Sequence, residues 1–243
     1  MDEGYVKEME RLANEGVVIE VDGKKFSSLS MHPVFYQPRP RPIMVRTLTA
    51  LTKYLKCDVD KIAMDKIIIH VQSPESVEVY SLMNGEDKGR DTLIAAKPDD
   101  ARYPFGKWLS GEEFIIAINS LFIQTPGRDE LLKYVAKIKM EKEATIEDDG
   151  VSQTASVRVG MRGNLTEDKA APGKVTLAPF RTFTEVEQPA SEFVFRMRTN
   201  DNEVQLSLHE ADGGAWKREA MKNVGVWIED EFNTLAGTPT VLY

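Results

Sequence analysis

Two glutamates in the second half of the chain have the spacing of a metal site. Glu185 and Glu187 are two residues apart, and on a β-strand this spacing points both carboxylates to the same face. Paired carboxylates on one face could hold the divalent cation of a metal-dependent nuclease. Such a nuclease also needs an aspartate on a neighbouring strand and a lysine beside the glutamate, and the sequence EVEQ lacks that lysine. We therefore favour a solvated or interface role for these glutamates over metal chemistry.

A histidine, two carboxylates and a tryptophan lie close together in the segment HEADGGAW, which begins at His209. This segment is either a catalytic cluster or the corner at which a strand turns into a helix. Asp212 stands where a turn or N-cap aspartate is expected, and the glycine pair after it permits a reversal of the backbone. We favour the corner, in which Glu210 and Asp212 are the residues to test for function. The residues that form the corner itself are Gly213, Gly214 and Trp216, with the tryptophan as its anchor.

The sequence lacks the motifs of the common catalytic and cofactor sites. Its three histidines, at positions 32, 70 and 209, have no second histidine or cysteine within the spacing of a metal motif. His70 lies in an apolar strand, where a core or edge histidine is commoner than a ligand. The nucleophile, Walker and dinucleotide-binding patterns are absent, and GMRG at 160–163 is interpreted as a turn rather than a nucleic-acid clamp. The sequence therefore predicts no catalytic residue, metal or cofactor.

Basic residues gather around the end of a proline-rich segment. No acid interrupts residues 39–56, and the aromatic residues Phe35 and Tyr36 come just before them. This basic window could contact the phosphates of a single-stranded nucleic acid. Alternatively, the proline-rich basic arm could wrap around an acidic neighbouring subunit. We favour the second hypothesis. The basic residues of the window are Arg39, Arg41, Arg46, Lys53 and Lys56.

The composition bears on partners and compartment. The chain has 31 basic and 39 acidic residues and a formal net charge of −8, so long-range electrostatics repel a polyanion unless the basic residues share one face. Its single cysteine, Cys57, excludes an intramolecular disulfide. The N-terminus lacks a secretory pattern, and no apolar run approaches the ~20 residues of a spanning helix. We therefore expect a cytoplasmic protein that does not insert into a membrane.

The elements that position these residues begin with a short N-terminal section. Residues 4–15 carry apolar side chains at helical spacing, which predicts an amphipathic helix. The dipeptide Asp22-Gly23 supplies the turn of a predicted hairpin. Four prolines, at positions 33, 38, 40 and 42, predict an extended arm over residues 31–42, because proline fixes φ and removes a backbone donor.

Helices and strands follow the arm. Apolar residues recur at helical spacing over residues 43–56, which predicts a helix. Ser110 and Glu113 form a capping box, so another helix begins there, and a further helix follows the break at 125–130. The apolar stripe of the helix predicted at 43–56 comprises Met44, Leu48, Leu51 and Leu55. Strands are predicted at residues 66–71, 76–82 and 91–97.

The character of the sequence changes near residues 146–153. Beyond this point, apolar and polar residues alternate over 155–161, which predicts a strand with one solvent-exposed face, and a polar loop follows at 163–173. Short strands separated by turn residues then predict a β meander, and an apolar stripe predicts a closing helix at 215–232. The strands of the meander are predicted at 175–177, 181–187, 192–198 and 204–209.

Strands and helices are grouped rather than strictly alternating, which favours an α+β fold over a doubly wound sheet. We predict mixed and antiparallel sheets, built from hairpins and the C-terminal meander, with four to five helices. Residues 1–42 form the N-terminal helix, hairpin and arm, residues 43–145 an α+β lobe, and residues 146–243 a β-meander lobe with the C-terminal helix. The last two segments are also compatible with one continuous domain.

Long strings of the sequence carry a family resemblance. They are DDGVSQTASVRVG, VTLAPFRTFTEVEQPASEFVFRMR and EADGGAWKREAMKNV in the second half, with RTLTALTKYL and IIIHVQSPESVEVYS in the first. On these strings the chain resembles the YfdQ-like family of uncharacterised phage and prophage proteins, from about residue 46 to residue 232. The resemblance implies a bacterial cytoplasmic setting among phage replication and recombination genes. It implies no activity, cofactor or catalytic residue, and it favours the corner interpretation because EADGGAW matches without the preceding histidine.

Three functions are compatible with these observations. The first is a non-enzymatic phage protein that self-assembles into a homo-oligomer, with the arm and the polar loops at 84–90 and 163–173 as subunit contacts. The second is an accessory protein of phage DNA recombination or replication that binds single strands through the basic window. The third is a metal-dependent enzyme. It would use Glu185, Glu187, Glu210 and Asp212. We favour the first, because every familiar catalytic spacing is missing.

Overall fold

A computed structural model describes most of the chain after residue 40 and short parts of the chain before it. The chain divides into two compact units, Met1–Arg39 and Pro40–Tyr243, and each is described by itself. The described residues are 4, 7–8, 11, 18–21, 24–27, 41–83, 88–99, 102–139, 144–148, 153–157, 169–170, 172–200, 203–234 and 237–243.

The N-terminal unit contains the hairpin that the turn dipeptide predicts. Strands β1 (Val18–Val21) and β2 (Lys24–Ser27) pair antiparallel, with Val21 opposite Lys24. Four residues of the predicted helix at 4–15 are described, and all four are helical and exposed. Among them, Arg11 forms an ion pair of 2.7 Å with Glu8. The predicted arm lies outside the described residues except for its last two positions, 41 and 42.

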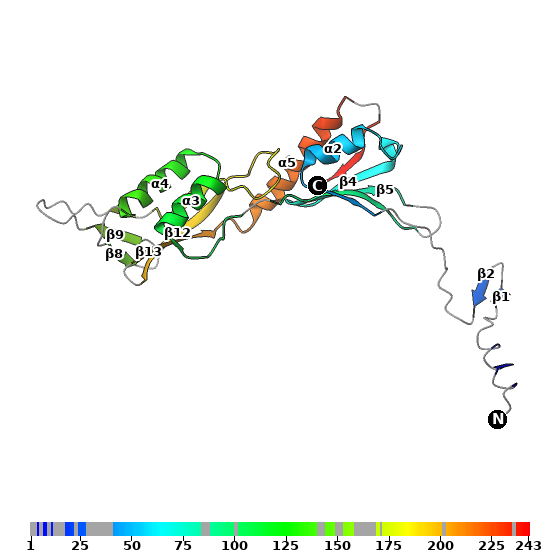
Figure 1. Ribbon diagram of the computed structural model, residues 1–243, viewed down its shortest axis with the longest axis horizontal. Helices are drawn as coiled ribbons and strands as arrows, with labels where there is room; N and C mark the ends of the chain where they lie inside the picture. The colour runs from blue at the N-terminus through cyan, green and yellow to red at the C-terminus, as the bar shows by residue number, and fades with distance from the viewer. Residues whose placement is uncertain are drawn as a thin grey trace, which may run out of the picture. The chain divides into compact units, whose positions relative to one another are not determined.

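A five-stranded mixed sheet forms the first half of the larger unit (Figure 1). Its central strands are β4 (Ile67–Ser73), β5 (Ser76–Ser81) and β6 (Thr92–Ala96), which pair antiparallel in that order. The two edge strands pair parallel to their neighbours: β14 (Thr240–Leu242) lies beside β4, and β3 (Ile43–Val45) lies beside β6. The central strands lie where the sequence predicts them, and each edge strand leaves one side unpaired in the described sheet.

Two helices pack on one face of this sheet, as Figure 1 shows. They are α2 (Leu48–Lys56) and α5 (Ala215–Phe232), and α5 has the bounds that the apolar stripe predicts. Their apolar sides meet alternate residues of the central strands in a core that we call the aliphatic core. Its members include Leu48, Leu51, Ile67, Ile69, Val77, Val79, Ile94, Val224 and Ile228, all at most 1% exposed.

The helix predicted at 43–56 begins later than expected. Residues 43–45 form β3, and Thr47 caps α2 by accepting a hydrogen bond of 3.1 Å from the backbone of Ala50. Met44 therefore does not join the buried stripe and is 62% exposed. The prediction was wrong here because pairing with β6 gives residues 43–45 an extended partner, and the threonine side chain stops the helix from extending backwards.

A four-stranded antiparallel sheet organises the second part of the larger unit, in the order β11, β12, β13, β7. Helices α3 (Gly111–Leu121) and α4 (Pro126–Lys139) pack beside it, and the capping box of Ser110 and Glu113 is present at the start of α3. The core here is rich in aromatic rings, and we call it the aromatic core; it includes Phe114, Phe122, Phe193 and Phe195. The strands are β11 (Lys174–Leu177), β12 (Ser191–Asn200), β13 (Glu203–Glu210) and β7 (Leu109–Ser110).

A separate three-stranded sheet lies between α4 and β11 in the sequence. It consists of β8 (Ala144–Asp148), β9 (Gln153–Val157) and β10 (Lys169–Ala170), paired antiparallel. The strand predicted at 155–161 corresponds to β9, which begins earlier, and the predicted loop at 163–173 contains the two residues of β10. The segment 158–168, with GMRG, lies outside the described residues.

The two cores do not follow the predicted segment boundary at residue 145. The aliphatic core takes residues from α2, the five-stranded sheet and α5, while the aromatic core takes residues from α3, α4 and the four-stranded sheet. Each core therefore combines chain from both sides of that boundary, and Pro40–Tyr243 is one compact unit. The grouping of helices and strands makes the fold α+β. None of the helices in the described part of the chain is long and apolar enough to cross a membrane.

Candidate functional site

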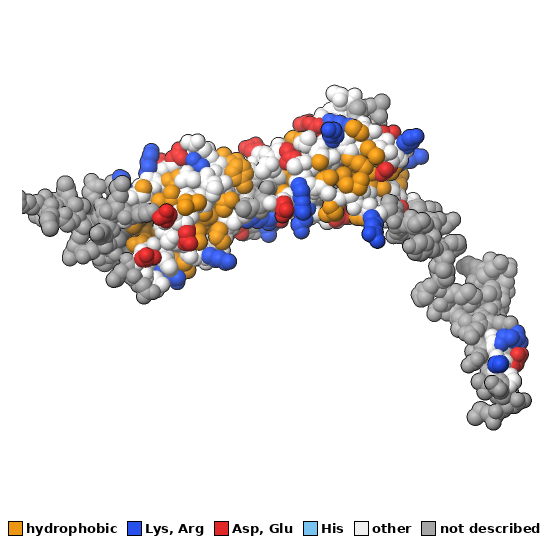
Figure 2. All heavy atoms as spheres, in the orientation of Figure 1, with side chains coloured by type: hydrophobic (Ala, Val, Ile, Leu, Met, Phe, Trp, Pro, Cys, Tyr) orange, Lys and Arg blue, Asp and Glu red, His pale blue; other side chains and the backbone are white. Residues whose placement is uncertain are grey.

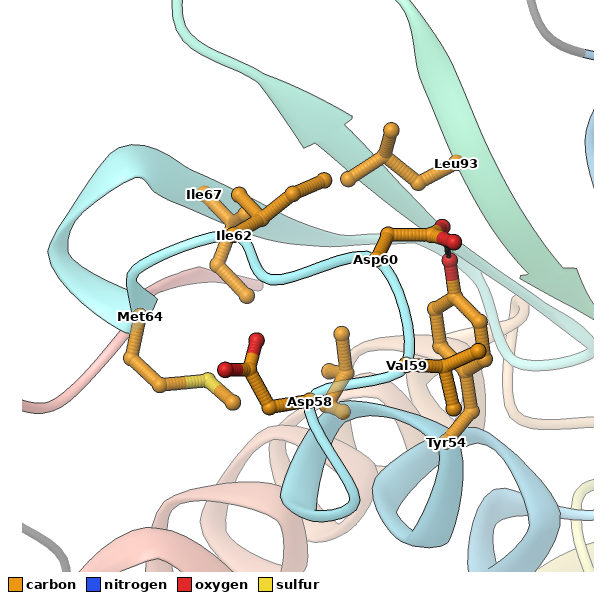
Figure 3. A pocket seen from close by; sticks show the side chains of 9 residues that line it. Tyr54, Asp58, Val59, Asp60, Ile62, Met64, Ile67 and Leu93 are labelled. Carbon is orange, nitrogen blue, oxygen red and sulfur yellow. Dashed lines mark hydrogen bonds between the residues drawn. The ribbon is translucent and has the colours of Figure 1, made fainter.

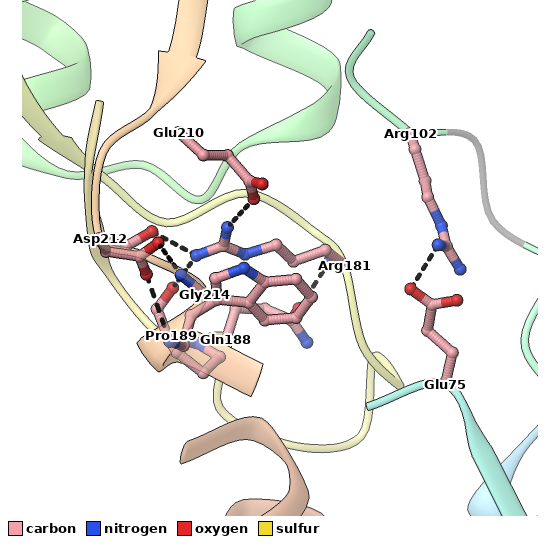
Figure 4. A network of polar contacts seen from close by, with 10 residues as sticks. Glu75, Arg102, Arg181, Gln188, Pro189, Glu210, Asp212 and Gly214 are labelled. Carbon is pink, nitrogen blue, oxygen red and sulfur yellow. Dashed lines mark hydrogen bonds and ion pairs between the residues drawn. The ribbon is translucent and has the colours of Figure 1, made fainter. Parts of the chain in front are cut away.

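A buried arginine lies at the centre of the corner that the sequence singles out (Figure 4). Arg181 is 5% exposed, and its Nη1 donates a hydrogen bond of 2.8 Å to the Glu210 carboxylate at the end of β13. Its Nη2 donates to the Ser191 hydroxyl and, at 3.5 Å, to the Pro189 carbonyl. Its guanidinium carbon lies 3.9 Å from the centroid of the Trp216 ring. The arginine thus joins the corner to the segment before β12.

The corner between β13 and α5 is built as a strand-to-helix turn. β13 ends at Glu210 and α5 begins at Ala215, and the two glycines between them have φ angles of 63° and 82°. Such positive φ angles favour glycine over residues with a side chain. Asp212 accepts hydrogen bonds from the backbone of Gly214 at 3.0 Å and of Trp216 at 3.2 Å. Its carboxylate therefore caps the first turn of α5, where the helix dipole favours a negative charge.

The arginine is held charged in an enclosed place. Burial lowers the pKa of the Arg181 guanidinium, and the carboxylates of Glu210 and Asp212 oppose this shift. A buried guanidinium is tolerated when it is paired and stacked on aromatic rings. Two buried N–H groups of this cluster, Nε of Arg181 and Nε1 of Trp216, have no hydrogen-bond acceptor among the described residues. With the arginine almost fully buried, we interpret this cluster as a structural clamp rather than a reactive centre.

Glu185 and Glu187 do not lie on a strand, and this prediction was wrong. Residues 181–187 form an irregular turn around the side chain of Gln188, which is 4% exposed. The Gln188 amide oxygen accepts from the backbone of Arg181 at 3.0 Å and of Thr182 at 3.2 Å. Its nitrogen donates to two carbonyls of the same turn, at 2.8 and 3.1 Å. One side chain thus replaces the strand partner that these backbone groups would otherwise need.

The four candidate carboxylates do not converge on one point. Glu185 accepts a hydrogen bond of 3.2 Å from the backbone of Thr49, in the first turn of α2, whereas Glu210 and Asp212 serve the corner. Glu187 is exposed, and its backbone carbonyl accepts from the Asn223 side chain at 3.0 Å. Across the described ranges, no group of three or more histidine, cysteine, aspartate or glutamate side chains is placed to hold a metal ion.

The basic window is divided by the fold. Arg41 and Lys53 are exposed, while Arg46 lies 3.7 Å from the Asp99 carboxylate and Lys56 pairs with Glu231 of α5 at 2.5 Å. The Lys56 ammonium also lies 5.7 Å from the centroid of the Phe232 ring. The remaining members of the predicted contact set, Phe35, Tyr36 and Arg39, lie outside the described residues. At least two of the basic side chains thus have acidic partners within the fold.

The five-stranded sheet has a second face, which no described helix covers (Figure 1). We call this the outer face. Residues of β4 and β5 alternate between the aliphatic core and the outer face, because successive side chains of a strand point to opposite sides. The strand register places one residue of each strand in a row across the outer face. In sheet order this row is Leu242, His70, Glu78, Ala95 and Met44.

The ends of this row are apolar and accessible. Met44 is 62% exposed and Leu242 is 47% exposed, and both belong to the edge strands. Ile68 of β4 and Tyr80 of β5 are half-buried and sit opposite one another on the same face. Figure 2 shows hydrophobic side chains at the surface of the part of the molecule that carries this sheet, beside lysine and arginine side chains. Exposed apolar and aromatic side chains grouped on one face are typical of an interaction surface.

Polar residues occupy the middle of the outer face. Tyr80 donates a hydrogen bond of 2.5 Å to the Glu78 carboxylate and accepts one of 2.8 Å from the Gln72 side chain. Burial and the neighbouring Glu78 raise the pKa of the Tyr80 hydroxyl. The His70 ring lies 6.4 Å from the Tyr80 ring, between centroids, and its side chain makes no hydrogen bond to the rest of the described chain. The outer face was not predicted from the sequence, although the polar residues at every second position, His70 and Gln72, were a signal.

Two hollows are seen elsewhere in the larger unit. A small one of about 10 Å³ lies under the loop after α2, where Tyr54 donates a hydrogen bond to Asp60 (Figure 3). Burial first, and then Asp60, raise the pKa of Tyr54 to about 12. A wider one of about 590 Å³ lies between the start of α4 and β11. Its lining mixes apolar side chains with Glu130, Tyr134 and Lys174, and we assign no chemistry to it.

Comparison with known proteins adds no relative. No family model, no curated protein and no solved structure matches this chain.

Proposed function

We propose that this chain is a non-enzymatic protein that acts by self-assembly into a homo-oligomer. The resemblance to YfdQ-like proteins supports a phage or prophage origin and a role in the cytoplasm of a bacterial host, and membership of that family is part of the proposal. In this view the molecule presents surfaces to copies of itself rather than a reactive centre to a substrate.

The observation that carries the proposal is the outer face of the five-stranded sheet. Helices α2 and α5 pack on one side only, while the other side presents Met44 and Leu242, 62% and 47% exposed. The sheet also ends on two edge strands, β3 and β14, each with one side unpaired in the described sheet. Both edge strands are three residues long and follow a proline, Pro42 or Pro239, which limits pairing through the edges themselves. The uncovered face, with apolar side chains at its ends and polar ones in its middle, therefore favours a face-to-face contact with another chain.

The residues that could do chemistry support the same proposal, because the fold uses them for structural contacts. Glu210 neutralises the buried Arg181, Asp212 caps α5, and Glu185 accepts from the first turn of α2. These contacts account for three of the four carboxylates that a metal-dependent mechanism would require.

The proposal is tested by the mass of the protein in solution. Multi-angle light scattering on the full chain, from micromolar to several hundred micromolar concentration, should give a mass that rises above the 27.4 kDa of one chain. A mass of one chain over the whole range would refute the proposal.

A second candidate function is an accessory protein that binds single-stranded nucleic acid. It is favoured by the exposed Arg41 and Lys53, which have no ion pair with another described residue, and by the aromatic Tyr80 on an open sheet face. The same light-scattering experiment separates the two functions. A mass that rises only when a single-stranded oligonucleotide is added, and falls again with salt, would favour this second function.

A further inference from the structure

The order of residues across the outer face bears on how two copies could meet. His70 on β4 and Glu78 on β5 are direct cross-strand neighbours at the middle of the row. On their outer sides lie Leu242 of β14, next to His70, and Ala95 of β6, next to Glu78. An imidazole ring and a carboxylate thus lie side by side, each flanked by an apolar residue.

A two-fold axis makes this row complementary to itself. In a two-fold interface both copies use the same surface. If one residue of the first copy contacts another residue of the second copy, the same contact is made with the two copies exchanged. If the axis runs parallel to the strands, midway between β4 and β5, His70 of one copy faces Glu78 of the second copy. Leu242 then faces Ala95 of the second copy. Ile68 faces Tyr80 of the second copy, because Ile68 and Tyr80 are cross-strand neighbours within each chain. These pairs join apolar positions of β14, β4 and β6 to apolar or aromatic ones, while Met44, on β3, lies beyond the edge of the second copy.

The geometry points to this two-fold, face-to-face contact as the way in which two copies of the chain associate, and the inference rests on the proposed self-assembly. The chain has a net charge of −8, so long-range electrostatics oppose the approach of a second copy. The outer face carries a single carboxylate in its central row, and that carboxylate meets a histidine. The His70 side chain has no hydrogen-bond partner in the described chain, so its ring nitrogens are available to the Glu78 carboxylate of a second copy.

The overlap of the two faces indicates a weak contact. Four strands, β14 to β6, overlap under this axis, and at a spacing of ~4.8 Å, with about five residues along each, they give a flat area on the order of 300 Å² per copy. Stable interfaces bury about 800 Å² per partner. We therefore expect a weak dimer that forms at the higher concentrations of the light-scattering experiment, stacked as two sheets about 10 Å apart.

Site-specific cross-linking tests the geometry. Two variants are made in a Cys57→Ser background, Leu242→Cys and Ala95→Cys, and each is treated with a short bis-maleimide alone and as a mixture. The two-fold contact predicts a cross-linked dimer mainly in the mixture, because position 242 of one copy faces position 95 of the other, whereas two copies of the same position lie three strand spacings apart across the contact. Ile116→Cys, on the exposed side of α3, serves as a control that should not cross-link with either variant. Hydrogen exchange confirms that each variant keeps the fold.

The outcomes separate the inference from the function on which it rests. Cross-linking in the mixture at least fivefold above either single variant supports the two-fold contact. Equal yields in all samples, or none, from a chain that light scattering shows to be oligomeric overturn the contact but leave self-assembly standing. A chain that is monomeric at several hundred micromolar overturns both.

Discussion

At the scale of single residues, Arg181 shows how the fold uses candidate functional carboxylates for structural contacts. The carboxylates of Glu210 and Asp212, the Ser191 hydroxyl and the Trp216 ring all surround it. Removing a charged group from such a place leaves its partners without compensation, and this loss is larger than the net value of the ion pair itself. The strength of the clamp can therefore be measured by truncation.

Arg181→Ala should lower the free energy of unfolding by about 3 kcal/mol, because a buried charge, its hydrogen bonds and its stacking on Trp216 are all lost. Urea titration followed by tryptophan fluorescence measures the change. Lys174→Ala is the matched control: Lys174 pairs with Glu192 at 3.2 Å, but both side chains are more than half exposed. The control should change stability by less than about 0.5 kcal/mol. Equal effects of the two substitutions would show that the clamp does not stabilise the fold.

The sequence identified only one side of this clamp. Asp212, the two glycines and Trp216 were recognisable because turn, cap and anchor residues sit next to each other in the chain. Their arginine partner was missed, because Arg181 lies 29 residues before Glu210 and no local pattern links the two. The role of Glu185 was missed for the same reason, since its backbone partner is Thr49, 136 residues away.

At the scale of elements, local signals explain which predictions succeeded. The capping box at Ser110, the hairpin dipeptide and the apolar stripe of α5 each act over a few residues, and all three elements are present. The predicted strand at 181–187 failed because its alternating sequence competes with Gln188, whose side chain satisfies four backbone groups of that turn. β3 and β14 were missed because three residues are too few to show a period.

The contact between α5 and the C-terminal strand gives a second prediction. Gly225 of α5 lies under the ring of Tyr243, and a Cβ at this position would fall far inside van der Waals distance of the ring. Gly225→Ala should therefore displace Tyr243 and speed hydrogen exchange of β14. In a Tyr243→Ala background the same change should instead stabilise the protein by about 1 kcal/mol, through the higher helix propensity of alanine. A similar stabilisation in both backgrounds would contradict the close packing.

At the scale of the whole molecule, the distribution of surface types favours association over catalysis. Two cores build the larger unit, and the helices of the aliphatic core leave one face of its sheet open. The α+β class followed from the grouping of elements in the sequence, but the open face did not. Which side of a sheet its helices cover depends on how distant segments, here α2 and α5, return to the same strands. The row across the outer face likewise depends on the register of five strands.

The most direct test of the account is the solution mass of a variant with an altered outer face. Ile68→Lys combined with Leu242→Lys places two charges on the outer face, at positions that meet Tyr80 and Ala95 of the second copy, and Ile116→Lys, at 60% exposure on α3, is the control. Charges at an apolar contact oppose association, so light scattering should give 27.4 kDa for the double variant at concentrations where wild type and control are oligomeric. An oligomer unchanged by the double substitution would contradict the assignment of the outer face as the subunit contact.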